Sequence, residues 1–288
     1  MSTPKTLLSA PFQSCSSKLH PSTRYLGRLD TMKRQDLVTW LNDFLNIALF
    51  DDSSLNGLQV EGGKEVSKVA VAVDASLETF KRGAELGADI IIVHHGLFWG
   101  EQIPVIGTHR ERLKVLLENN ISLYAAHIPL DAHKEVGNNW GLARILGLED
   151  LGDFGLYRGT PIGVKGVFPD GIILRDLADR VETNLSEVTG RRESVLVHAG
   201  EPDTVIGTIG IISGGAAGEI VTASHEKLDA FLTGEPKHEL FHEAFERKIA
   251  ALYAGHYMTE TVGVNILAEK LRSEFNLEVE FILHPTGL

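Results

Sequence analysis

The chain contains one short phrase twice, and this repetition constrains its fold more than any other feature of the sequence. Residues 123–127 read Leu-Tyr-Ala-Ala-His and are followed four residues later by Asp131; residues 252–256 read Leu-Tyr-Ala-Gly-His and are followed four residues later by Glu260. In each copy an apolar, strand-like run ends in an imidazole and then a carboxylate. Together these groups suit a divalent cation of intermediate hardness.

The similarity between the two segments extends beyond the phrase. If Asp89 is laid on Asp229, the apolar run 69–75 falls on 209–215, and one gap about as long as the loop 97–107 brings the two phrases together. Strands rich in Val and Ile resemble one another by chance, which is the alternative for the longer alignment. Alternating apolar runs and helical stretches predict parallel strands with crossover helices. We therefore expect an α/β fold of two diverged, pseudo-symmetric α/β repeats packed together with a metal cleft between them.

The organisation along the chain follows from this alternation. We predict a first repeat over 32–146, a connecting region with a helix and weak strands over 147–204, and a second repeat over 205–288. Apolar spacings of three and four predict a helix over 34–49, and residues 56–60 are expected to form a loop.

Residues 1–31 differ in composition from the rest of the chain. They are rich in Ser and Thr and lack helical periodicity, which is typical of a disordered N-terminal extension. A transit peptide or a start codon set too early are the alternatives. We expect a cytoplasmic protein, or an organellar one if this segment is a transit peptide.

Charge and cysteine content exclude several classes of protein. The formal charge of the 288 residues is −12, which disfavours binding to the phosphate backbone of nucleic acids. No apolar stretch approaches the roughly 20 residues that span a bilayer, so no membrane partner is expected. A single cysteine, Cys15, excludes a cysteine-based zinc site, so any metal must be held by His and carboxylate.

A third apolar run, residues 89–93, ends in the adjacent pair His94 and His95. In open α/β sheets ligands bind beyond the carboxyl ends of the strands, where His127 and His256 are also expected. Adjacent residues at a strand end diverge in direction, so the pair would serve two cations, or one cation and a supporting contact. Two ions bridged by a carboxylate can activate a water molecule as a nucleophile.

At these residues the chain resembles a known family, the NIF-three-like dinuclear metal proteins, also catalogued as GTP cyclohydrolase I type 2 homologues. The resemblance rests on His94-His-Gly-Leu-Phe-Trp99, the run from His127 to His133, Thr233-Gly-Glu235, and Ala254-Gly-His256 with Glu260, and it covers the chain from Met32 onward. It implies a homohexameric toroid with metal sites facing an internal cavity. It also implies two divalent ions per subunit. Mixed imidazole and carboxylate ligation suits zinc, iron, manganese or cobalt. The ligands that it implies are His94, His95, Asp131, His256 and a bridging Glu260, with His127 beside them in a supporting role.

Three functions are compatible with such a site. The first is a metal-dependent hydrolase of a nucleotide-like small molecule, with GTP ring opening as the named candidate and His127, Glu235 or His242 as the general acid or base. The second is a non-enzymatic metal-handling or scaffold hexamer. The third, a toroid that encircles DNA, requires a positive lining that the sequence does not provide.

Overall fold

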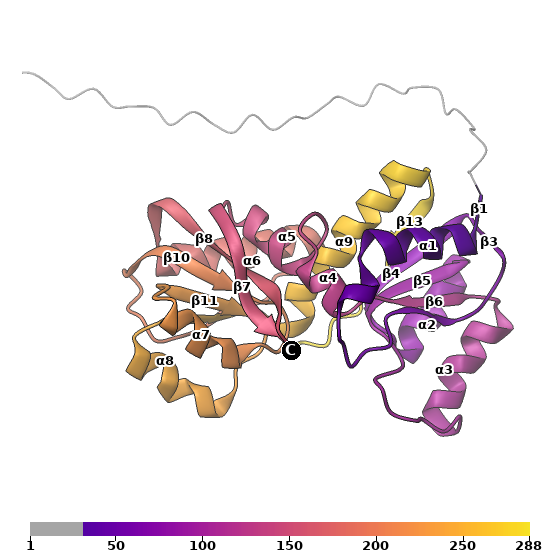
Figure 1. The fold of residues 1–288 in the computed structure, drawn as a ribbon, viewed down its shortest axis with the longest axis horizontal. Helices are drawn as coiled ribbons and strands as arrows, with labels where there is room; N and C mark the ends of the chain where they lie inside the picture. Colours follow the sequence, from indigo (N-terminus) through magenta and orange to yellow (C-terminus); the bar gives the residue numbers. More distant parts are fainter. Residues whose placement is uncertain (1–30) are drawn as a thin grey trace, which may run out of the picture.

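The computed structural model describes residues 31–288, in which two β-sheets lie on either side of a long central helix, α9 (His256–Phe275) (Figure 1). The expectation for residues 1–31 therefore falls, except for Thr31, outside the described residues. None of the helices in the described range is long and apolar enough to cross a membrane.

The first sheet has the strand order β13-β4-β5-β6-β2. Its strands are β2 (Gly57–Val60), β4 (Lys68–Asp74), β5 (Ile90–His95), β6 (Ser122–Ala125) and β13 (Glu278–Phe281). Strands β13, β4, β5 and β6 are parallel, and β2 is antiparallel to β6. A short antiparallel pair, β1 (Met32–Lys33) and β3 (Glu65–Val66), lies outside this sheet. The sheet is thus completed by β13 from the C-terminal end of the chain.

The second sheet has the order β7-β8-β10-β11-β12-β9. Its strands are β7 (Glu149–Tyr157), β8 (Thr160–Ile173), β9 (Leu196–His198), β10 (Val205–Ile211), β11 (Ala230–Thr233) and β12 (Ala250–Tyr253). Strands β10, β11 and β12 are parallel, β9 is antiparallel to β12, and β8 is antiparallel to β10. The connecting region expected over 147–204 does contain strands, but β7 and β8 form a long antiparallel hairpin there instead of the weak strands that we expected.

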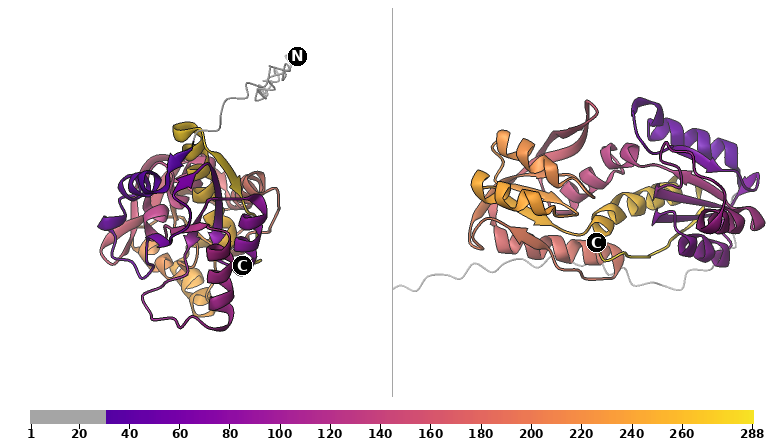
Figure 2. Two further views of the ribbon diagram at one scale, coloured as in Figure 1. Left: turned by 90° about the vertical axis from the view of Figure 1, so that its right-hand side faces the viewer. Right: turned by 90° about the horizontal axis from the view of Figure 1, so that it is seen from below.

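Helices cover both faces of each sheet. The helices are α1 (Arg34–Phe44), α2 (Leu77–Leu86), α3 (Gly107–Glu118), α4 (Ile128–Ala132), α5 (Asn138–Ile145), α6 (Leu174–Thr189), α7 (Ile220–His225) and α8 (Phe241–Arg247), with 3₁₀ turns η1 (Ile47–Leu49), η2 (Ala217–Glu219) and η3 (His238–Leu240). The largest apolar core joins one face of each sheet to α1, α5, α6 and α9. Two smaller cores pack α2 and α3 on the first sheet, and α7 and α8 on the second. The central helices therefore make one body of the two halves, as Figure 2 shows from two further sides.

Local sequence explains where several helices begin and end. The side chain of Ser76 accepts a hydrogen bond of 3.1 Å from the backbone N–H of Thr79, which caps the start of α2. Gly87 ends α2 with φ of +70°, a conformation that costs glycine little. The helix expected over 34–49 was too long: Asn46 adopts φ of +52°, so α1 stops at Phe44 and η1 follows. The loop expected over 56–60 is also corrected, since β2 occupies 57–60.

Hydrogen bonds support the alignment of the two repeats at Asp89 and Asp229. Asp89 accepts bonds from the backbone N–H groups of Ser67 and Lys68, and Asp229 accepts them from those of Gly207 and Thr208. Each carboxylate thus ties the start of its own strand to the start of the preceding parallel strand. Equivalent aspartates perform the same task in both halves.

The duplicated phrase itself is displaced by one residue between the halves. Tyr124 pairs with Ile92, and Leu252, not Tyr253, pairs with the equivalent Leu232. Tyr124 and Leu252 both face the central core, whereas Tyr253 faces the outer one. Because side chains alternate along a strand, this shift turns each residue of the phrase to the opposite face. The repeated letters therefore do not mark equivalent positions, although both copies deliver a His and an acid to the same place.

Candidate metal centre

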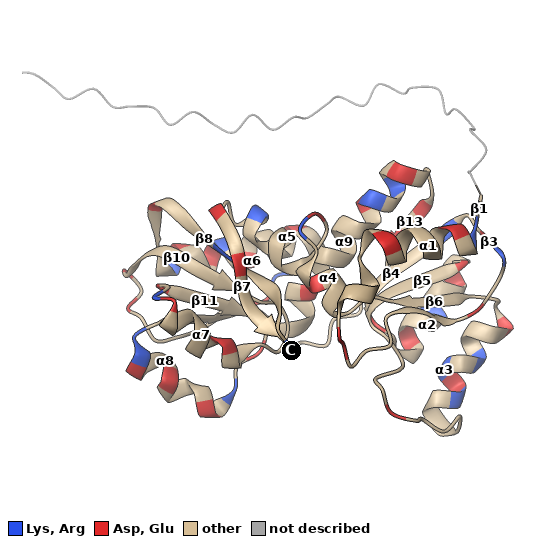
Figure 3. Cartoon of the chain, viewed as in Figure 1, with Lys and Arg blue, Asp and Glu red and all other residues tan. Residues whose placement is uncertain are grey.

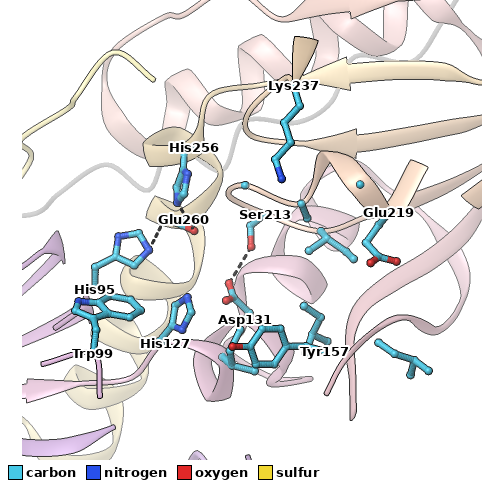
Figure 4. Close-up of a pocket in the computed structure, with 17 residues that line it drawn as sticks. His95, Trp99, His127, Asp131, Tyr157, Ser213, Glu219, Lys237, His256 and Glu260 are labelled. Atoms are coloured by element: carbon cyan, nitrogen blue, oxygen red, sulfur yellow. Dashed lines mark hydrogen bonds and ion pairs between the residues drawn. The ribbon is translucent and has the colours of Figure 1, made fainter. Parts of the chain in front are cut away.

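The ends of three strands and the starts of two helices bring six potential ligands together between the sheets, and Figure 4 labels all of them except His94. His94 and His95 end β5, and His127 precedes α4, which carries Asp131. His256 begins α9 directly after β12, and Glu260 lies one turn further along the same helical face. The structure thus gathers all six residues singled out in the sequence.

Glu260 occupies the centre of this cluster. Its Oε1 lies 3.0 Å from His256 Nε2 and 3.4 Å from His94 Nε2, and its Oε2 lies 3.3 Å from His95 Nε2. The residue is only 3% exposed. One buried carboxylate therefore faces imidazoles from both halves of the molecule.

Asp131 is held in place from the opposite side. Its Oδ1 accepts hydrogen bonds from Asn138 Nδ2 at 2.9 Å and Ser213 Oγ at 2.8 Å, while its Oδ2 lies 3.6 Å from His94 Nε2. One oxygen is thus committed to the protein, and the other faces the cluster.

The four histidines share one pattern of support. Each uses Nδ1 to donate to a fixed acceptor, because a carbonyl or carboxylate oxygen can only accept. The acceptors are the Ala126 carbonyl for His94 (3.0 Å), Asp74 for His95 (2.9 Å), Asp52 for His127 (3.0 Å) and Glu235 for His256 (2.6 Å). Metal-ligating histidines are typically oriented this way, with the other nitrogen left free for the ion.

The cluster is strongly coupled in the absence of metal. Burial lowers the pKa of His94, but the carboxylates of Asp131 and Glu260 outweigh it and leave that pKa above its usual value. Burial likewise opposes charging of His95 and His256, yet Glu260 and the orienting acids raise the pKa of His95 to about 10 and that of His256 to about 9. Burial raises the pKa of Glu260, but the surrounding imidazoles hold it well below its usual range. In the metal-free cluster, protons on the imidazole rings therefore balance the charge of the carboxylates, as a divalent cation would.

Unsatisfied atoms show that the donor set fits a cation. His94 Nε2 and Glu260 Oε2 are buried and have no hydrogen-bond partner among the described residues. Buried polar atoms are rarely left unpaired without a functional reason. The potential ligand atoms form three groups within 4.8 Å: His94, His95 and His127; His95, His256 and Glu260; and His94, Asp131 and Glu260. Imidazole and carboxylate suit zinc and related divalent metals.

Close packing reinforces this geometry at Gly214. This residue has φ of +66°, and a Cβ there would lie 2.3 Å from Glu260 Oε1. Only glycine lets the loop after β10 pass directly over the central carboxylate.

A cleft of about 470 Å³ opens beside the cluster and is lined by residues from both halves. His95, His127, Asp131, His256 and Glu260 form one wall. A small molecule in this cleft would therefore contact the candidate ligands directly, as clefts between halves of a fold commonly allow.

Sequence reasoning missed the residues that orient the cluster. Asp52, Asp74, Asn138 and Ser213 were not singled out. Glu235 was named in a motif of the resemblance and as a candidate acid or base, whereas in the structure it is the Nδ1 partner of His256. His133, in the run that carried the resemblance, bonds the Phe44 carbonyl through Nε2 instead of joining the cluster. His242 packs against Phe241 and does not line the cleft.

Comparison with known proteins places this site in a wider group. The sequence profile of the Duf34/NIF3 (NGG1p interacting factor 3) family matches residues 32–286. A curated relative from Deinococcus radiodurans, named GTP cyclohydrolase 1 type 2 homolog, is 46% identical over 255 residues, which cover 88% of this chain and 94% of the relative.

Solved structures match the same part of the chain. The crystal structure of TTHA1606 from Thermus thermophilus has a TM-score of 0.80 at 48% identity and covers 89% of this chain and 100% of that one. Protein ybgI, described as of unknown function, also gives a TM-score of 0.80, at 37% identity, with 89% and 100% covered. These similarities support the fold along nearly the whole described chain.

Proposed function

The chain belongs to the Duf34/NIF3 family, and on that premise we propose that it binds two divalent cations and is a metal-dependent hydrolase of a nucleotide-like small molecule. The observation that carries this proposal is the arrangement of the four histidines. Each has its Nδ1 held by an acceptor, and they meet two carboxylates in a buried cluster beside an open cleft.

The grouping of ligand atoms supports two positions rather than one. His95, His256 and Glu260 would hold one ion, and His94, Asp131 and Glu260 would hold the other. Glu260 belongs to both groups, and its carboxylate lies within 3.4 Å of imidazole nitrogens from each of them, which supports a bridging role. His127 then stands beside the ligands, as the resemblance implies.

Two bound ions would supply Lewis acidity and bring the pKa of a water molecule down to about 7. The protein's own residues would do the rest. His127 lines the cleft and is oriented by Asp52, whose carboxylate is 1% exposed. With Nδ1 committed to Asp52, His127 has Nε2 available to accept or return a proton. Ser213 and Asn138 keep Asp131 from turning away.

The name of the Deinococcus relative makes GTP the first nucleotide to test. Protein stripped with a chelator should be inactive, and zinc, manganese, iron or cobalt should restore turnover of at least one nucleotide in a panel that includes GTP. Asp131→Asn should lower this activity strongly, while Asp179→Asn, a change on the exposed face of α6, should not. Metal binding without turnover of any nucleotide would favour a metal-handling protein instead.

We also propose that the protein assembles as a homohexamer. Exposed apolar side chains in the loop before α3 support this, because Val105 and Ile106 are 57% and 68% exposed in the single chain. Figure 3 shows acidic as well as basic positions on α3 and α8, and the formal charge of −12 disfavours the DNA-encircling alternative. Sedimentation equilibrium of the purified protein measures the number of chains directly.

A further inference from the structure

The cleft beside the cluster has a polar wall and an apolar wall. The apolar part of the lining consists of Ile128, Leu156, Tyr157, Ile162 and Ile212, and Trp99 lies next to the histidines. A volume of about 470 Å³ lies within the usual range for pockets that take small molecules. The apolar wall has no counterpart in the metal chemistry, so it points to a ligand with an apolar or aromatic part.

Of the described residues that line the cleft, Lys237 is the sole lysine or arginine. In Figure 4 its side chain extends into the cleft. No acid in residues 31–288 lies within ion-pair distance of its ammonium group, and it follows Pro236 in the loop whose Glu235 orients His256. A cation without a partner, placed among acids in a protein of charge −12, is available for an anion.

Gly218 forms part of the cleft wall without a structural reason to be glycine. It lies in η2, outside the positive-φ conformations, and a Cβ built there would meet nothing within 4 Å. By contrast, packing against Glu260 requires glycine at position 214. Where neither φ nor packing demands glycine, the missing side chain leaves room for a ligand to approach the backbone.

Trp99 offers a flat surface next to the cluster. Its Nε1 donates a 2.9 Å hydrogen bond to the Gly96 carbonyl, and its ring centroid lies 5.0 Å from that of His127. The hydrogen bond fixes the indole ring where a planar group in the cleft could stack on it.

We propose that Lys237 is a specificity residue that binds the phosphate of a substrate combining a planar ring with a phosphate group, the ring resting near Trp99 and the molecule passing over Gly218. This proposal rests on the proposed function, and it adds the residues that select the phosphate and the ring of such a substrate.

The first test compares two probes that differ only in phosphate, guanosine and GMP. Binding to zinc-loaded full-length protein is followed by stopped-flow quenching of tryptophan fluorescence, before any turnover. We expect GMP to bind more tightly, and Lys237→Gln to weaken GMP about ten-fold or more while leaving guanosine unchanged. Lys237→Arg should preserve the preference. Lys81→Gln, on the outer helix α2, serves as the matched control.

The second test uses Gly218→Ala, with Gly152→Ala in β7 as its control. A Cβ at Gly152 meets only ordinary contacts, and this residue does not line the cleft. We expect Gly218→Ala to keep or raise thermal stability, because alanine restricts the unfolded chain, and to weaken GMP several-fold. The control should bind GMP normally.

The outcomes separate this inference from the proposed function. An unchanged GMP preference in Lys237→Gln would show that the ions alone hold the phosphate, and would overturn the role of Lys237. No binding of either probe would overturn the substrate class. Selective binding without hydrolysis would support the inference while contradicting the hydrolase proposal.

Discussion

Replacing Glu260 with Gln removes the one carboxylate shared by both proposed ion positions. The side chain keeps its size but loses its charge, and an amide nitrogen, which can only donate hydrogen bonds, takes the place of one of the two oxygens. Its oxygens lie 3.0 to 3.4 Å from three imidazole nitrogens, so no neighbouring group can replace it. We expect Glu260→Gln to lose both ions together.

In the metal-free protein, the loss of stability that Glu260→Gln causes can be worked out from the pKa of His95. Its pKa of about 10, against a usual 6.5, means that folding favours the protonated ring. At pH 7.5 this preference contributes about 3 kcal/mol to the free energy of unfolding, and Glu260 is its main favourable cause. The protonated ring of His95 stabilises the fold fully below a pH of about 6.5, the pKa in the unfolded chain. This stabilisation is lost as the pH rises through about 10, the pKa in the folded chain. The stability difference between wild type and variant should therefore shrink towards pH 10.

Two assays measure these effects on the same preparations. Elemental analysis counts ions per chain, and urea unfolding of chelator-treated protein at pH 7.5 and pH 10 gives the stability difference. Glu269→Gln, an exposed change on the same helix, is the matched control. His95→Ala should spare the ion at His94, Asp131 and Glu260. Retention of both ions by Glu260→Gln would refute the bridging role.

Three further predictions concern the surroundings of the cluster. His127→Ala should keep its metal at saturating supply while turnover falls roughly 10–100-fold; loss of metal in elemental analysis would make His127 a ligand instead. A chain that begins at Met32 should keep its thermal midpoint and oligomer size, because the family match begins at residue 32; a large drop in either would show that residues 1–31 contribute to the fold. Metal binding at pH 7.5 should release at least about two protons per chain, since the raised pKa values of His95 and His256 keep both rings protonated beforehand; calorimetric heats that do not vary with the ionisation enthalpy of the buffer would contradict this.

The fold was predictable where strands are short, apolar and buried. The apolar run 69–75 forms β4 at 68–74, and the apolar run 89–93 forms β5 at 90–95. The hairpin of β7 and β8 was missed because its glycines suggested loops. A Cβ at Gly163 would lie 2.5 Å from the Ile212 side chain, and one at Gly166 would lie 3.0 Å from the Glu149 carbonyl. These glycines allow close packing, which sequence alone does not distinguish from a turn.

The candidate ligands were predictable because each lies at a strand end or within about one turn of it along the following helix. The groups that orient them were not, since Asp52 and His127 are 75 residues apart and meet only in the folded chain. Asp74 did carry a signal, because it ends β4 beside the strand that ends in the His pair. The sequence carried no signal for the displaced register of the repeated phrase, because the pairing of a strand also depends on the strand next to it.

Anomalous diffraction from crystals of the full-length protein, purified without chelator, tests the two-ion cluster most directly. We predict two peaks on either side of Glu260, about 3.5–4 Å apart as in other two-metal sites, with one next to His95 and His256 and the other next to His94 and Asp131. A single peak, or none among these residues after soaking with zinc, would contradict the account.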